Sequence, residues 1–127
     1  MLQKVLSYFY DICSIPHGSG NTSMLLEYCR SFAAEHKLPY ITDNTGNIII
    51  FKNGTDGYET SPSVILQGHL DMVCVKEESC NIDFLKDGLN VRREGDFIFA
   101  EGTSLGGDDG IAIAYALAIL DSDSISH

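Results

Sequence analysis

A histidine and an aspartate, one residue apart, follow an apolar segment and have the chemistry of a metal-binding pair. Residues 64–66 read VIL and predict a buried strand over residues 64–68, after which come His69 and Asp71. Side chains two positions apart in a strand point to the same face. A neutral imidazole commonly binds zinc through one nitrogen while its other nitrogen donates to a carboxylate. The pair can therefore supply a metal ligand and its orienting partner, although a structural histidine beside a turn-forming aspartate explains the same residues.

Two consecutive aspartates stand in a glycine-rich stretch where the last predicted helix begins. Residues 106–110 read GGDDG. A carboxylate at a helix N-terminus is favoured by the free amide groups and the helix dipole, so capping explains one of the two aspartates. Capping does not require the second, and one of the pair could instead bridge two cations about 3.5–4 Å apart, as in two-metal hydrolases. The glycines would let the backbone approach such a site closely.

Other polar motifs favour structural explanations. The HGSG stretch at residues 17–20 lacks the lysine of a phosphate-binding loop, so we interpret it as a turn between helices with His17 in a structural role. The pair Glu77 and Glu78 lies in a polar stretch and is expected to be solvated. No cysteine has an evident catalytic partner, which gives nucleophilic catalysis by a thiol little support.

Composition excludes some classes of partner. The 127 residues carry 18 acidic and 8 basic side chains, a formal net charge of -10, which argues against nucleic-acid binding because phosphates must be neutralised by lysine and arginine. The four cysteines form no Cys-x-x-Cys pair, and we expect reduced thiols and a cytoplasmic location. The N-terminus has neither a basic region nor an unbroken apolar stretch, so neither a secretion signal nor a membrane span is predicted.

Periodicity predicts the elements that must position these residues. Apolar residues at helical spacing indicate helices over residues 2–12 and from about residue 23 to the mid-thirties, and a hairpin is expected from residues 40–43 with 48–51. A second hairpin is suggested by RREGDFIFAEG, and the stretch after Gly107 predicts a helix that is apolar on nearly every side and must pack in a core or against a sheet. The alternation favours one α/β domain with three layers. The sequence stops directly after this helix, so we expect it to be the front part of a longer protein.

The chain resembles the N-terminal part of bacterial aminoacyl-histidine dipeptidases, which belong to the co-catalytic zinc peptidases. The resemblance rests on five ordered blocks: ICSIPHGSGN, NTGNIII, VILQGHLDMV, DFLKDGL and GTSLGGDDGIAIAYALAIL. It implies that residues 1–127 form the first part of a three-layer α/β catalytic domain of the zinc-peptidase type. The C-terminal half of that domain and the lid and dimerisation domain would be absent.

The resemblance also implies roles for single residues. His69 would bind one zinc ion, Asp71 would orient its ring, and Asp108 would bridge two zinc ions, with Co²⁺ or Mn²⁺ as possible replacements. Relatives commonly carry Gly-Ala-Asp-Asn-Gly at residues 106–110, so Gly107 and Asp109 depart from the pattern. Related enzymes often have a cis peptide after the bridging aspartate, which here would join Asp108 to Asp109. Many relatives also have histidine where this chain has isoleucine at position 82, so no ligand is expected there.

The implied activity is hydrolysis of dipeptides, typically with C-terminal histidine, by a cytoplasmic enzyme that is a homodimer at full length. The general-base glutamate and the remaining ligands of such enzymes lie downstream, so we expect these 127 residues alone to be inactive and to bind zinc weakly. A different class of function is a non-catalytic scaffold or association module that retains the peptidase fold. Within the same clan, an aminotripeptidase or an N-acyl amino acid deacylase would share these ligands.

Overall fold

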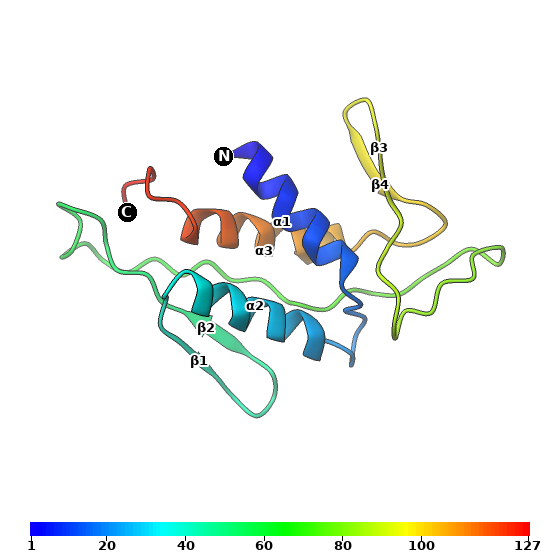
Figure 1. Cartoon of the computed structure of the whole chain (residues 1–127), viewed down its shortest axis with the longest axis horizontal. Helices are drawn as coiled ribbons and strands as arrows, with labels where there is room; N and C mark the ends of the chain where they lie inside the picture. The colour runs from blue at the N-terminus through cyan, green and yellow to red at the C-terminus, as the bar shows by residue number, and fades with distance from the viewer.

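The computed structural model describes residues 1–127 and shows three helices with two separate hairpins (Figure 1). Helix α1 spans Leu2–Ser14, α2 spans Ser23–Glu35 and α3 spans Gly107–Leu120. The hairpins are formed by strands β1 (Tyr40–Thr42) and β2 (Ile48–Ile50) and by strands β3 (Val91–Glu94) and β4 (Phe97–Ala100). Both pairs are antiparallel, with Tyr40 opposite Ile50 and Val91 opposite Ala100. The predicted helices and both predicted hairpins are therefore confirmed.

The core lies where α1 packs against α3, with one face of α2 completing it. Side chains of all three helices form one buried cluster: Val5, Phe9, Ile12, Cys13, Leu25, Phe32, Ala114, Leu117 and Ala118. Small residues of α3 allow the close approach, since a Cβ at Gly110 would lie 3.3 Å from the Phe9 ring. The contact with α1 thus holds the N-terminal end of α3, where the two aspartates lie. The opposite side of α3 exposes Ile111 and Tyr115, so this apolar helix is only partly covered.

The prediction of a buried strand over residues 64–68 is wrong for this chain. Residues 62–71 run as an extended segment along the molecule (Figure 1), but their amides and carbonyls form no backbone–backbone hydrogen bond. Val64 is 83% exposed and Ile65 is 86% exposed. A β-strand requires a neighbouring strand to pair its peptide groups, and no other segment of the chain lies in that position. The apolar composition of residues 64–66 did not show that a pairing strand is absent.

The fold class is mixed α/β, as expected. The three-layer arrangement stays a prediction, because the two sheets have only two strands each. All four cysteines are free thiols, which agrees with the expected reduced state. No helix has the length and apolar character needed to cross a membrane.

Candidate metal centre

The two sequence motifs with metal-binding chemistry meet in the structure. His69, Asp108 and Asp109 each offer one ligand atom, and these atoms all lie within 4.8 Å of one another. The Nε2 atom of His69 is 3.2 Å from Oδ1 of Asp108, and the His69 amide donates to Oδ2 of Asp109 over 3.3 Å. Residues about 40 positions apart in the sequence thus form one cluster of nitrogen and oxygen donors.

Both ring nitrogens of His69 face oxygen atoms. Nδ1 lies 2.8 Å from the carbonyl oxygen of Asp71 and 3.2 Å from Oδ1 of its carboxylate. A carbonyl oxygen can only accept a hydrogen bond, so the proton belongs on Nδ1, which donates to Asp71. In the neutral ring, Nε2 then directs a lone pair toward the Asp108 carboxylate. Either a proton or a metal cation between these two atoms satisfies that arrangement, so the donor set fits a metal ion.

The carboxylates around His69 favour a positive charge at this point. Partial burial lowers the pKa of His69, but the hydrogen bond to the Asp71 carbonyl and the carboxylates of Asp108 and Asp71 outweigh it, so the pKa is raised. The pKa of Asp71 is held below its ordinary value, chiefly because Ser19 donates a hydrogen bond to its carboxylate. The Asp108 side chain is 94% exposed. The cluster is therefore an open, acidic site that attracts cations.

Glycines allow the aspartate turn to approach the segment that carries His69. A Cβ at Gly68 would lie 2.8 Å from Oδ2 of Asp109, and a Cβ at Gly106 would lie 3.0 Å from the Met72 side chain. Gly106 has a φ of 69°, in the left-handed region that favours glycine. The backbone of Asp108 and Asp109 is not helical, and the peptide bond between them is cis, as expected. Both aspartates are placed beside His69 by this turn and not by regular helix.

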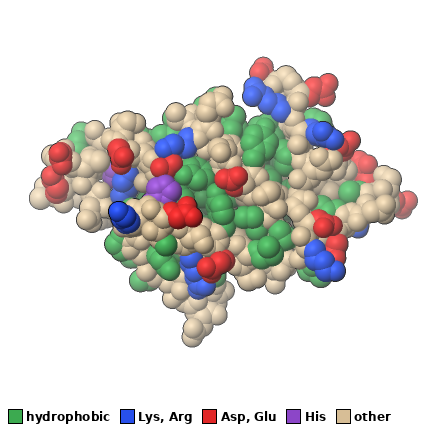
Figure 2. All heavy atoms as spheres, viewed as in Figure 1, with side chains coloured by type: hydrophobic (Ala, Val, Ile, Leu, Met, Phe, Trp, Pro, Cys, Tyr) green, Lys and Arg blue, Asp and Glu red, His purple; other side chains and the backbone are tan.

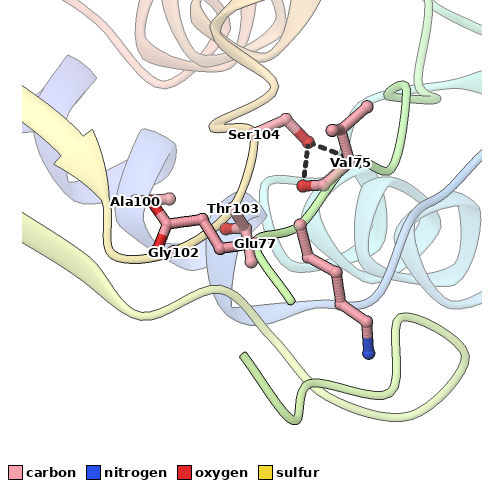
Figure 3. Close-up of a pocket in the computed structure, with 7 residues that line it drawn as sticks. Val75, Glu77, Ala100, Gly102, Thr103 and Ser104 are labelled. Atoms are coloured by element: carbon pink, nitrogen blue, oxygen red, sulfur yellow. Dashed lines mark hydrogen bonds between the residues drawn. The ribbon is translucent and has the colours of Figure 1, made fainter. Parts of the chain in front are cut away.

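A separate cavity lies between the segment that follows the metal cluster and the loop after β4. It measures about 360 Å³ and is lined by residues 75–77, Ala100 and residues 102–104 (Figure 3). The Ser104 hydroxyl donates to the Val75 carbonyl over 3.3 Å and accepts from the Val75 amide over 3.1 Å, which ties the two walls together (Figure 3). None of the clustered metal-binding groups lines it, so we do not assign chemistry to this cavity.

Comparison with known proteins identifies relatives of this chain. The chain is 41% identical over 125 residues to the cytosol non-specific dipeptidase of Escherichia coli (strain K12). It also superposes on the crystal structure of aminoacylhistidine dipeptidase from Vibrio alginolyticus with a TM-score of 0.94 and 40% identity. The chain is homologous to part of these dipeptidases. No family model matches it.

The dipeptidase-like chain accounts for only a portion of each relative. Each match covers 98% of this chain, but 26% of the E. coli dipeptidase and 25% of the Vibrio chain. The chain thus spans about a quarter of the length of these relatives. The mixed α/β fold of this portion is shared with a dipeptidase of known structure.

The predicted site residues of this dipeptidase-like chain lie together, and two further residues join them. His69, Asp71 and Asp108 form one connected set, as described above. Asp109 belongs to the cluster although the sequence assigned it no role, and the doubled aspartate was the signal. Ser19 was missed altogether, because its HGSG stretch was interpreted as a simple turn.

The structure agrees with the non-catalytic positions predicted for His17, Glu77 and Glu78. His17 is 4% exposed, and its Nδ1 lies 2.6 Å from the Ile15 carbonyl oxygen. Glu77 and Glu78 are exposed, as predicted.

Proposed function

We propose that this chain supplies part of the metal site of a dipeptidase. His69 and Asp108 are the metal ligands, and Asp71 orients the His69 ring. The observation that carries the proposal is the 3.2 Å approach of His69 Nε2 to Asp108 Oδ1, with Nδ1 already engaged by Asp71. An imidazole and a carboxylate suit Zn²⁺, and they also accept Co²⁺ or Mn²⁺.

The contacts of the two neighbouring aspartates favour Asp108 as the bridging carboxylate. Oδ2 of Asp109 accepts a hydrogen bond from the His69 amide, so this side chain already holds the two segments together. Asp108 contacts only the His69 ring and is otherwise open to solvent. A carboxylate that is free on one side can be shared between two cations.

A metal ion held by His69 and Asp108 would polarise the scissile carbonyl and lower the pKa of a coordinated water. The chain's own residues prepare for this chemistry: Asp71 keeps the proton of His69 on Nδ1, so that Nε2 presents its lone pair beside Asp108. Dipeptides are the proposed substrates because both relatives carry dipeptidase names. One name is non-specific and the other specifies aminoacylhistidine, so a preference for C-terminal histidine rests on the resemblance alone.

We further propose that the 127 residues alone bind metal weakly and do not hydrolyse dipeptides. A structural or catalytic zinc site uses three or four protein ligands, and one histidine with one or two aspartates cannot complete two such sites. The complete enzyme would be a cytoplasmic homodimer.

A scaffold or association module is the second candidate function. The observation that favours it is the exposed segment 62–71, whose unpaired peptide groups and apolar side chains resemble a strand that lacks its neighbours. This function does not require the cluster around His69, and a metal-binding measurement separates the two candidates.

The test is titration of the chain with Co²⁺, followed by its visible absorption, which reports both affinity and coordination geometry. We expect saturable binding by the wild-type chain and at least a tenfold loss of affinity in His69→Ala and in Asp108→Ala. Asp96→Asn, an exposed aspartate in the turn between β3 and β4, is the matched control and should leave the affinity unchanged. Absence of saturable binding, or equal affinity in all variants, would contradict the metal site.

A further inference from the structure

The HGSG stretch, which the sequence indicated as a turn between helices, lies directly against the segment that carries His69. The Met72 amide donates to the His17 carbonyl over 3.0 Å, and the Ser19 amide donates to the Met72 carbonyl over 3.1 Å. These bonds form a parallel bridge between Gly18 and Met72. The turn is therefore paired with the end of the metal-site segment over a sequence separation of more than 50 residues.

The side chain of Ser19 continues this contact to the candidate metal ligand. Its hydroxyl donates to Oδ2 of Asp71. The other oxygen of the same carboxylate, Oδ1, lies 3.2 Å from Nδ1 of His69. A chain of polar contacts thus runs from Ser19 through Asp71 and His69 to Asp108.

We propose that Ser19 is a positioning residue that holds the Asp71 carboxylate so that the His69 ring presents Nε2 to the metal. This inference rests on the proposed metal site and adds a second residue, after Asp71, behind the ligand His69. The Asp71 side chain is 40% exposed, so packing alone does not prevent its carboxylate from rotating. A hydrogen bond to a charged carboxylate is among the stronger ones in proteins and can fix its orientation.

The backbone around Ser19 is itself fixed by close packing. A Cβ at Gly18 would lie 2.5 Å from Sγ of Cys74, so a larger residue there would require the Cys74 side chain to move. On the other side of the turn, the buried ring of His17 reaches Gly106, two residues before Asp108, since a Cβ at Gly106 would lie 3.4 Å from His17 Nε2. The turn therefore contacts both segments of the metal site, which gives the Ser19 hydroxyl a defined position.

The experiment compares Ser19→Ala, Ser19→Thr and the control Ser61→Ala, whose serine is exposed and lies outside the polar contacts that run from Ser19 to Asp108. Nitrogen-15 NMR of the metal-free chain, at a pH where the ring is neutral, reports which nitrogen of His69 carries the proton. We expect the proton on Nδ1 in the wild type, in Ser19→Thr and in Ser61→Ala. In Ser19→Ala we expect a measurable share of the Nε2–H tautomer, because only the 2.8 Å contact with the Asp71 carbonyl oxygen then still favours Nδ1. Co²⁺ affinity should fall about tenfold in Ser19→Ala and be retained in Ser19→Thr.

The two readouts separate this inference from the metal site itself. A mixed tautomer in Ser19→Ala supports the positioning role even if the wild type binds no Co²⁺, in which case only the metal site fails. An unchanged tautomer together with unchanged affinity in a folded Ser19→Ala would overturn the inference. Should Ser19→Ala not fold, Ser19→Cys serves instead, because a thiol of similar size is a weak donor and should give a partial loss of the tautomer preference. Wild-type behaviour of Ser19→Cys would then overturn it.

Discussion

At the scale of single residues, two glycines that both have positive φ differ in what surrounds them. Gly20 and Gly106 both have positive φ, 80° and 69°. Nothing lies within 4 Å of a Cβ placed on Gly20, whereas a Cβ on Gly106 would lie 3.0 Å from Cβ and Sδ of Met72. Met72 is 2% exposed and has little room to move. Gly106 therefore combines a conformational requirement with a spatial one, at the turn that presents Asp108.

This difference predicts unequal losses of stability. Gly20→Ala should lower the free energy of unfolding by about 1–2 kcal/mol, the cost of a left-handed conformation for a residue with a side chain. Gly106→Ala should lower it by about 2–5 kcal/mol, because overpacking against Met72 adds about 1–3 kcal/mol. Urea denaturation followed by circular dichroism measures both values. Equal losses in the two variants would show that Met72 does not constrain Gly106.

At the scale of elements, one carboxylate joins the ends of the three helices. Asp121 directly follows α3, and its carboxylate lies 2.7 Å from Lys4 Nζ, 2.7 Å from the Tyr8 hydroxyl and 3.0 Å from His36 Nε2. Lys4 and Tyr8 belong to α1, and His36 follows α2. An aspartate at a helix C-terminus is unfavourable for the helix dipole, and these donors offset that cost. Partial burial raises the pKa of Asp121, but the hydrogen bonds from Lys4, Tyr8 and His36 outweigh it and the pKa is lowered.

The lowered pKa predicts a dependence of stability on pH. Because the folded state binds the Asp121 proton less readily than the unfolded state, this group stabilises the fold above its ordinary pKa of about 4 and loses that effect as pH falls further. Asp121→Asn should therefore cost about 1–2 kcal/mol at pH 5 and less at pH 3. Urea midpoints of wild type and variant at the two pH values test this, with the exposed Asp123→Asn as control. An equal cost at both pH values would contradict the assignment.

At the scale of the whole molecule, the chain exposes more surface than a compact protein of its mass. Its accessible surface is 8341 Å², against about 6,700 Å² expected for a folded monomer of 13.9 kDa. Only 19 of the 127 residues are buried. Apolar side chains reach the surface across the middle of the face shown in Figure 2, and the segment with Val64, Ile65 and Leu66 is exposed as well. Much apolar surface is thus available for contact with other protein.

Charged substitutions in the exposed segment should reduce its binding of apolar dye and its self-association, without changing the packing of the core. We expect the double variant Val64→Lys with Ile65→Lys to bind less of the dye ANS and to self-associate less, with a free energy of unfolding within about 0.5 kcal/mol of the wild type. Ile12→Ala is the contrasting variant, because this fully buried side chain should cost about 2–5 kcal/mol. Dye fluorescence and light scattering after size exclusion measure the first effect. A large loss of stability in the lysine variant would mean that residues 64–65 are packed.

Local patterns in the sequence were sufficient for the helices, the hairpins and the candidate metal ligands. Leu2, Val5 and Phe9 recur at helical spacing, and the types of His69 and Asp108 carry their chemistry wherever the chain places them. These features depend on neighbours a few residues away, which the sequence shows directly. The lack of a pairing partner for residues 64–68, the contact of Ser19 with Asp71 and the place of Asp109 depend on segments far apart in the chain. Only the tertiary structure decided them, because a strand needs a partner and a hydroxyl needs an acceptor, and folding determines which distant groups come within reach.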